Sequence, residues 1–270
     1  MLARILIDNI TKNEFASEWG LAAWIEHNGH SFLLDTGATG AFIENADAMK
    51  LDIERAEFGV LSHAHYDHAD GLAAFFQRNA QAKFYLRRGC AENCYGKRWI
   101  FSKYIGIQKG NLTRYSDRIV YVDGDYEIIP GVTLVPHKTP GLELIGKKAG
   151  MYIKKNGRQY PDCFSHEQSL VINTERGLII FNSCSHGGAD NIILEVMKTF
   201  PDQKLYALIG GFHLYRSSDE EVHALADRIQ KTGIETIYTG HCTGDRALEI
   251  LRKKLGDRVQ QFYAGMEIVL

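Results

Sequence analysis

One short stretch constrains this chain more than any other, Ser-His-Ala-His-Tyr-Asp-His at residues 62–68. Three histidines and one aspartate fall within six consecutive residues, and neutral imidazole and carboxylate are the ligands that zinc and similar divalent metals prefer. Residues 58–61 are predicted to form a short apolar strand, and residues 71–76 to begin an amphipathic helix. A loop between a strand and a helix lets side chains converge outside a sheet, so this stretch predicts a metal site.

One ion is not expected to take all four ligands, because neighbouring side chains in a tight loop point in different directions. We therefore expect His63 and His65 to serve one metal, and Asp67 and His68 to serve a second metal beside it. The alternative is a solvated polar loop with scattered histidines. The density of ligand residues disfavours that alternative.

The motif His-Ala-His-Tyr-Asp-His, followed by Gly71 and Leu72, resembles the signature of the metallo-β-lactamase superfamily of metal-dependent hydrolases. The resemblance implies a single domain over residues 1–270 with a four-layer α/β/β/α sandwich built on two mixed sheets. Pattern alone predicts only an α/β fold with a mixed sheet. It rests on a recurring order of strand, short loop and helix, at residues 58–76, 177–199, 205–230 and 236–255.

A predicted strand at residues 31–34 ends in Asp35-Thr36-Gly37. An aspartate followed by small residues can simply form a turn. It can also accept a hydrogen bond from behind a metal ligand and so hold the metal loop. In the superfamily a similar strand ending in Asp-x-Gly packs beneath the histidine loop, so we expect the second role for Asp35.

Two further histidines, His186 and His241, each follow a predicted buried strand and precede a helix. A site with three protein ligands keeps one position for water. The predicted ligand sets are His63, His65 and His186 for the first metal, and Asp67, His68 and His241 for the second. The resemblance supports His241, because the superfamily supplies a late histidine just before a final helix. His166, with Glu167 beside it, is the alternative to His186.

Cys184 marks a departure from the superfamily pattern. The superfamily usually places an aspartate that bridges both metals at the end of a strand like residues 177–181, and this chain has Cys184 near that point. Either Cys184 is a softer ligand to the second metal, or the site has no bridging carboxylate.

Three motifs narrow the resemblance: Cys184-Ser185-His186, residues 210–214 and residues 239–244. They resemble the branch of the superfamily named for dihydropterin ribofuranosyl-aminobenzene phosphate synthase. His213 has no place in either ligand set. We expect it to orient substrate or to stabilise developing charge, and its alternative role is to cap the helix predicted from Asp219.

The predicted function is a hydrolase, or a related lyase or transferase, with two divalent metal ions. Zinc is the default metal, and iron or manganese would also suit the ligands. Metal lowers the pKa of bound water, so a metal-bound hydroxide is the expected nucleophile. Asp67 is expected to orient it. The alternatives are a di-iron redox centre and a metal-dependent sensing protein with little turnover.

Residues 87–118 are predicted to be an insertion over the active site. The segment carries eight Lys and Arg residues against only Glu92 and Asp117, and aromatic residues are interleaved with them. Guanidinium groups match phosphate and carboxylate, so Arg87, Arg88 and Arg98 are predicted to bind a small anionic substrate, phosphorylated or pterin-like. The alternative is a solvated basic loop. Residues 139–163 are predicted to be irregular.

Composition excludes several other classes of protein. The formal net charge of -2 gives no field that favours nucleic acid or a membrane surface. No apolar stretch is long enough to span a bilayer, and residues 1–8 lack the layout of a signal peptide. The five cysteines are odd in number and widely spread, which favours a reducing cytoplasm over a disulfide framework. Whether the protein forms a homo-oligomer stays open.

Overall fold

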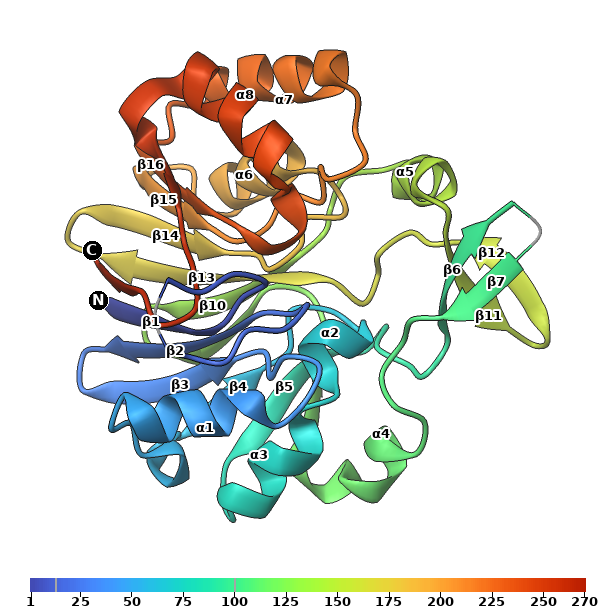
Figure 1. Ribbon diagram of the computed structural model, residues 1–270, viewed down its shortest axis with the longest axis vertical. Coiled ribbons are helices and arrows are strands. Elements are labelled where there is room, and N and C mark those ends of the chain that lie inside the picture. Colours follow the sequence, from blue (N-terminus) through green and yellow to red (C-terminus); the bar gives the residue numbers. More distant parts are fainter. Residues whose placement is uncertain (13, 100) are drawn as a thin grey trace. The chain divides into compact units, whose positions relative to one another are not determined.

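The computed structural model describes residues 1–12, 14–99 and 101–270 (Figure 1). The chain forms two compact units. Unit 1 contains residues 1–123, 140–167 and 263–270, and unit 2 contains residues 124–139 and 168–262. Each unit has its own sheet, its own helices and its own cluster of buried apolar side chains.

Unit 1 is built on a seven-stranded sheet with the order β18-β1-β2-β3-β4-β5-β8. Its strands are β1 (Leu2–Ile7), β2 (Ala22–His27), β3 (His30–Leu34), β4 (Phe58–Val60), β5 (Lys83–Arg87), β8 (Ile119–Val122) and β18 (Glu267–Val269). The sheet is mixed, because β3, β4, β5 and β8 run parallel whereas β1 is antiparallel to both β2 and β18. The terminal amino group of Met1 donates to the Leu270 carbonyl at 2.8 Å. The first and last segments of the chain therefore lie side by side in this unit (Figure 1).

The helices of unit 1 are α1 (Ala41–Ala48), α2 (Tyr66–Ala69), α3 (Leu72–Arg78), α4 (Asn111–Arg114) and α5 (Leu142–Ala149). Phe42 of α1 and Phe75 of α3 are fully buried in one apolar cluster with Leu33 and Phe84 of the sheet. The turn between β2 and β3 is made by Asn28 and Gly29, which both have positive φ, at 50° and 83°. That is the backbone a two-residue hairpin turn requires.

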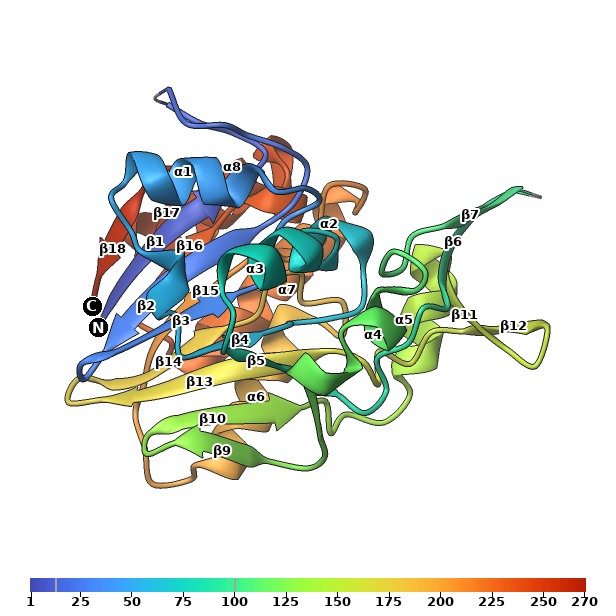
Figure 2. The same cartoon turned by 90° about the horizontal axis from the view of Figure 1, so that it is seen from below.

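A smaller sheet of unit 1 corrects two expectations. Residues 139–163 were expected to be irregular, and residues 87–118 to lie apart from any sheet. The structure instead pairs β6 (Cys94–Arg98) and β7 (Phe101–Tyr104) with β11 (Met151–Lys155) and β12 (Arg158–Pro161) in the order β12-β11-β6-β7. Its central pairing joins residues far apart in sequence, which local periodicity does not reveal. Figure 2 shows this sheet on the side of unit 1 away from the two termini.

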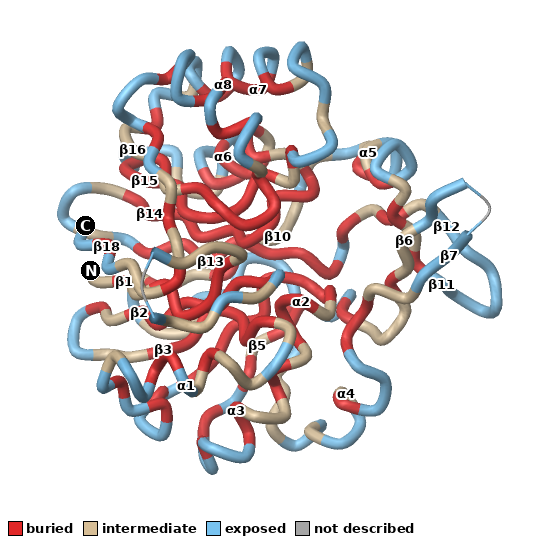
Figure 3. Tube along the Cα trace, viewed as in Figure 1, coloured by how far each residue is buried: buried red, intermediate tan, exposed pale blue. Residues whose placement is uncertain are grey.

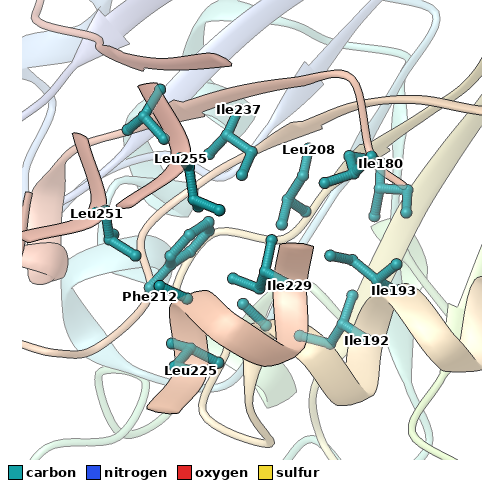
Figure 4. Close-up of a cluster of buried hydrophobic side chains, with 14 of the residues drawn as sticks. Ile180, Ile192, Ile193, Leu208, Phe212, Leu225, Ile229, Ile237, Leu251 and Leu255 are labelled. Atoms are coloured by element: carbon teal, nitrogen blue, oxygen red, sulfur yellow. The ribbon is translucent and has the colours of Figure 1, made fainter. Parts of the chain in front are cut away.

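Unit 2 has a second seven-stranded mixed sheet, with the order β17-β16-β15-β14-β13-β10-β9. Its strands are β9 (Tyr126–Ile129), β10 (Val132–Pro136), β13 (Gln168–Thr174), β14 (Gly177–Phe181), β15 (Leu205–Ile209), β16 (Thr236–Thr239) and β17 (Val259–Gln261). Its helices are α6 (Ala189–Thr199), α7 (Asp219–Thr232) and α8 (Asp245–Leu255). Strands β14 to β17 run parallel. Figure 4 shows Leu208 and Ile237 of this sheet facing Ile229 of α7.

The predicted repeat of strand, short loop and helix is confirmed in both units. The loop after β4 leads to α2 and α3, and the loops after β14, β15 and β16 lead to α6, α7 and α8. Because the carboxyl ends of parallel strands meet at one edge of a sheet, the three loops of unit 2 share an edge. Buried residues concentrate along the strands and in these loops (Figure 3). None of the described helices is both long and apolar enough to cross a bilayer.

Candidate metal centre

The histidine loop of unit 1 brings its four predicted ligands together. His63, His65, Asp67 and His68 are all buried. The ring centroids of His63 and His65 are 4.7 Å apart, and those of His63 and His68 are 4.2 Å apart. One detail differs from expectation, since Asp67 and His68 lie in the short helix α2 rather than in irregular loop.

Asp35 holds this loop from beneath. Its Oδ1 accepts the Ser62 backbone N–H at 2.7 Å, and its Oδ2 accepts the Ser62 hydroxyl at 2.6 Å. The same Oδ2 lies 2.8 Å from His68 Nδ1. A carboxylate in this position accepts, so His68 carries its proton on Nδ1 and Nε2 is its unprotonated nitrogen. That tautomer is the one that metal-binding histidines adopt when a carboxylate supports them.

The hydrogen bonds of Ser62 also determine the tautomer of His63. The Ser62 hydroxyl proton goes to Asp35, so Ser62 Oγ can only accept from His63 Nδ1, which lies 2.8 Å away. The proton of His63 is therefore also on Nδ1, and Nε2 is the nitrogen able to bind a metal. One buried carboxylate thus sets the tautomers of two histidines.

Asp70 follows the ligands at the end of α2. The pKa of Asp70 is raised to about 6. Burial raises this pKa most, the Gln108 N–H that donates to Asp70 lowers it, and the nearby Asp67 raises it. The hydrogen bond from Gln108 N–H to Asp70 Oδ1 is 2.6 Å long. It ties the segment after β7 to the histidine loop within unit 1.

Unit 2 gathers a second group of donors on the loops that follow β14, β15 and β16. The donor atoms of Cys184, His186 and His213 lie within 4.8 Å of one another, and so do those of Cys184, His241 and Cys242. Two thiol sulfurs, Cys184 Sγ and Cys242 Sγ, are 3.4 Å apart. Sequence reasoning missed Cys242, although its position next to His241 in a Gly-His-Cys-Thr-Gly motif was a signal for it.

Cys242 is well placed to be a thiolate. Burial by itself raises the pKa of this thiol, but the hydrogen bond with Cys184 and the nearby His241 and His213 lower it well below its usual value. The His213 backbone N–H donates to Cys242 Sγ at 3.2 Å. A lowered thiol pKa favours the form that binds metals.

The unit 2 loops adopt an uncommon backbone. Ser185, His213 and His241 have φ values of 52°, 49° and 48°. Residues other than glycine rarely adopt this left-handed region, and those that do cluster at functional sites. Hydrogen bonds support the turns, since Asn182 Oδ1 accepts the Ser185 N–H and Thr243 Oγ1 accepts the Phe212 N–H.

A carboxylate–histidine pair also packs against the first of these loops. Glu195 of α6 is buried, and its Oε2 lies 3.0 Å from His137 Nδ1. Its other oxygen accepts the backbone N–H groups of Lys138 and Thr139, each at 2.8 Å. The His137 ring fills the space beside Gly187, where a Cβ would lie 2.4 Å from His137 Cε1. Gly187 is therefore needed to let the loop approach the ring.

The three arginines predicted to bind substrate occupy different environments. Arg87 is buried at the end of β5. Arg88 is exposed and pairs with Asp123. Arg98 is exposed at the end of β6, in the small sheet.

Comparisons with known proteins agree on the family. Residues 20–145 match the model of the metallo-beta-lactamase superfamily. The 7,8-dihydropterin-6-methyl-4-(beta-D-ribofuranosyl)-aminobenzene-5'-phosphate synthase of Methanocaldococcus jannaschii is 25% identical over 96% of this chain and 96% of its own.

Among solved structures, a metal-dependent hydrolase of the beta-lactamase superfamily is 29% identical, with a TM-score of 0.86 over 100% of this chain and 99% of its own. A diphosphatase of the PhnP family is 12% identical with a TM-score of 0.57, over 100% of this chain and 97% of its own, and this likeness concerns the fold. The predicted α/β fold class with two mixed sheets is confirmed. The predicted resemblance is confirmed as well: residues 20–145 are a metallo-β-lactamase superfamily region, and the whole chain resembles members of that superfamily.

Proposed function

We propose that this chain is a metal-dependent hydrolase that acts on a small anionic substrate. The observation that carries the proposal is the hydrogen-bond system of Asp35, Ser62, His63 and His68. It places the protons of both imidazoles on Nδ1, which is the arrangement a metal ligand needs. Burying a carboxylate costs free energy unless it is paired or hydrogen-bonded. Orienting the two imidazoles toward a metal would give the buried Asp35 a function.

The proposed ligands are those that the sequence predicts. They are His63, His65 and His186 for one metal, and Asp67, His68 and His241 for the other, with Cys184 as a soft donor. Imidazole and carboxylate suit zinc, iron or manganese, and a thiolate adds preference for zinc or iron. The thiols and imidazoles gathered in unit 2 support including Cys184.

Two bound divalent metals would supply an activated water at neutral pH and stabilise negative charge on the substrate. The chain's own residues then have separate tasks. Asp67 has two carboxylate oxygens, so it can bind with one and orient a proton with the other. His213, next to His186 with ring centroids 4.6 Å apart, is proposed to orient the substrate or to donate to its developing charge.

The substrate class rests on the relatives and on the small sheet. The name of the Methanocaldococcus relative includes a dihydropterin and a 5'-phosphate, so we infer a phosphorylated or pterin-like compound for this chain. Trp99 and Phe101 beside Arg98 are 86% and 74% exposed, and such aromatic side chains can stack on a planar ring.

All five cysteines are free thiols, which supports a reducing, cytoplasmic location.

Metal analysis of anaerobically purified protein tests the proposal, together with a turnover screen of phosphate esters, lactones, thioesters and pterin compounds. We expect about two metals per chain, with His241→Ala losing mainly one. Asp67→Asn is expected to keep the fold and lose most turnover. His223→Ala, on an exposed position of α7, is the matched control and should keep both metals and full turnover.

Two results would contradict the proposal. Equal metal loads in the wild type and His241→Ala would remove His241 from the ligand set. Metal-loaded protein that consumes oxygen but hydrolyses no compound of the screen would favour the di-iron redox alternative.

A further inference from the structure

The two hairpins of the small sheet in unit 1, residues 94–104 and 151–161, carry an unusual set of charges. They contain six lysine and arginine residues and no aspartate or glutamate. All six are exposed, and they are Lys97, Arg98 and Lys103 in the first hairpin and Lys154, Lys155 and Arg158 in the second. Within the described part of the chain, none of the six forms an ion pair with a carboxylate. Their charges are therefore available to a partner.

The composition of the whole chain conceals this local charge. The chain has 31 Lys and Arg residues against 33 Asp and Glu residues. Outside the two hairpins, 25 basic residues therefore stand against the same 33 acidic ones. The hairpins are a cationic surface on an otherwise anionic molecule, and such a surface steers an anionic partner to one place.

Large aromatic side chains accompany these cations. Trp99, in the turn of the first hairpin, is 86% exposed, the highest value among the large apolar side chains of the described residues. Phe101 is also exposed and pairs with Arg98 across the turn. Tyr160 adds an exposed ring to the second hairpin. Apolar surface of this kind, gathered on a projecting part of the fold (Figure 2), is typical of a site that meets a partner.

Contacts between the hairpins hold these groups together. Strand β6 of the first hairpin pairs with β11 of the second. Gln159 Nε2 donates to Ser102 Oγ at 2.7 Å, which links the two outer strands of the sheet. The ammonium group of Lys97 lies over the Tyr152 ring of the other hairpin, 5.6 Å from its centroid. The two hairpins therefore present their cations and rings as one surface.

A small substrate does not account for this surface. It could contact Arg98 with Trp99 and Phe101, but it would leave the cations of the second hairpin unused. A strand of nucleic acid stacks its bases on rings that line a groove or a sheet face, whereas Trp99 stands in a turn. A projecting turn with an aromatic tip and cations behind it suits a lipid bilayer, where tryptophan lies at the headgroup level and lysine and arginine meet anionic lipids.

We propose that the two hairpins dock this protein on an anionic membrane surface. Trp99 and Phe101 enter the headgroup region, and the six cations lie against the lipid phosphates. The docking is peripheral and reversible, because each cation contributes modestly and salt screens the attraction. This inference goes beyond the proposed function and does not depend on it.

Sedimentation with lipid vesicles tests the proposal on the full chain. We expect binding to vesicles of phosphatidylcholine and phosphatidylserine in equal parts, no binding to phosphatidylcholine alone, and weaker binding as salt is raised. Lys154→Ala, Lys155→Ala and Arg158→Ala combined should weaken the binding at least about tenfold, because each cation near an anionic surface contributes about fivefold.

A matched control removes the same charge elsewhere. Lys231→Ala, Arg252→Ala and Lys253→Ala combined change three exposed cations of α7 and α8. This variant should bind the anionic vesicles as the wild type does. An equal loss in the control and in the hairpin variant would show that only total charge matters, and would overturn the proposal.

Tryptophan emission reports whether Trp99 enters the bilayer surface. The wild-type emission should shift to shorter wavelength when anionic vesicles are added. Trp99→Phe should remove that shift and bind within about threefold of the wild type, because phenylalanine keeps an apolar ring. Trp99→Ala should bind at least about tenfold more weakly, because the buried apolar surface is lost.

Three further results would overturn the proposal. One is the absence of binding to anionic vesicles, or equal binding to neutral ones. Another is a wild-type emission that does not shift on bound vesicles. The third is tighter binding of a single-stranded oligonucleotide than of vesicles, which would assign the hairpins to nucleic acid. None of these measurements involves metal or turnover, so the proposed function and this inference can fail separately.

Discussion

The histidine loop of unit 1 and the three donor loops of unit 2 are held in different ways. In unit 1, the support comes from buried side chains. Asp35 accepts hydrogen bonds from Ser62 and His68, and His166, which pairs with Asp162, accepts the Ala64 N–H. In unit 2, Glu195 supports the first loop from behind, and backbone shape and thiols contribute the rest. Ser185 and His241 adopt positive φ, and the Cys184 and Cys242 sulfurs are in contact.

The difference has a physical consequence. Hydrogen bonds to a carboxylate fix which nitrogen of an imidazole is protonated, so the tautomers of His63 and His68 are set by the fold itself. Thiols have no such tautomer and are set by their pKa. We therefore expect the unit 1 loop to depend most on its supporting side chains, and the unit 2 loops to depend most on ionisation and backbone shape.

The largest effect is expected from Asp35→Ala, which leaves the Ser62 N–H and His68 Nδ1 buried without their acceptor. Thermal or chemical unfolding of the metal-free protein should show a loss of about 3 kcal/mol, since each unsatisfied buried group costs about 1–3 kcal/mol. Asp35→Asn is the control, because asparagine tolerates the φ of 57° at this position and changes only charge and donors. A loss of unfolding free energy under about 1 kcal/mol in both variants would mean that Asp35 contributes little to the stability of unit 1.

A smaller effect is expected from Glu195→Gln, which weakens the support behind the Cys-Ser-His-Gly loop of unit 2. Burial raises the pKa of Glu195, but the hydrogen bond and charge of His137, with Thr139 and Lys138, lower it below the usual 4.5. An acid with a lowered pKa stabilises the fold at pH values above its unfolded pKa, and that stability is lost as pH falls through the folded pKa.

The free energy of unfolding of the wild type should therefore fall steadily below about pH 4.5, and Glu195→Gln should flatten that slope. At pH 7 the variant should lose roughly 2 kcal/mol. If the unfolding free energy of Glu195→Gln depended on pH as that of the wild type does, the ionised Glu195 carboxylate would not stabilise this loop.

Alkylation of Cys184 tests whether unit 2 responds to metal as a thiolate site should. Labelling by iodoacetamide should be at least about tenfold slower with metal bound than after chelation, which corresponds to about 1.4 kcal/mol. Cys163, which is partly exposed, is the internal control and should react equally in both states. Equal rates at Cys184 in both states would make it a bystander.

The smallest effect is expected from Ser185→Gly. Glycine relieves the left-handed backbone, worth about 1 kcal/mol, but it also gains freedom in the unfolded chain at a similar cost. The net change in unfolding free energy should stay within about 0.5 kcal/mol, measured by urea unfolding. A loss above about 1 kcal/mol would show that the Ser185 side chain itself supports the loop.

Parts of the fold were predictable because they are local. Strand β15 and helix α8 lie within the predicted units of strand, loop and helix at residues 205–230 and 236–255, since each has a strong period and clear ends. The small four-stranded sheet was not predicted, because Cys94–Arg98 pairs with Met151–Lys155 across a long intervening segment. Pairing between distant short strands leaves no period in either one.

The candidate site shows the same division. The dense motif of residues 63–68 and the role of Asp35 beneath it could be predicted from spacing and from the family resemblance. The contact between His166 and the Ala64 N–H could not, because it joins residues that are far apart in the sequence. Cys242 was missed for a similar reason, as its contact with Cys184 joins two loops from different strands.

The strand order of the unit 1 sheet also determines when its strands can pair during translation. Strand β1 is synthesised before its outer neighbour β18, and all of unit 2 is synthesised between them. Until then β1 presents a bare edge, which is the kind of strand that other chains can pair with. Arg4, which pairs with both Glu26 and Glu267 in the finished sheet, meanwhile offers a charge that discourages such pairing. Until β18 is made, translation products of this protein therefore need protection along the free edge of β1.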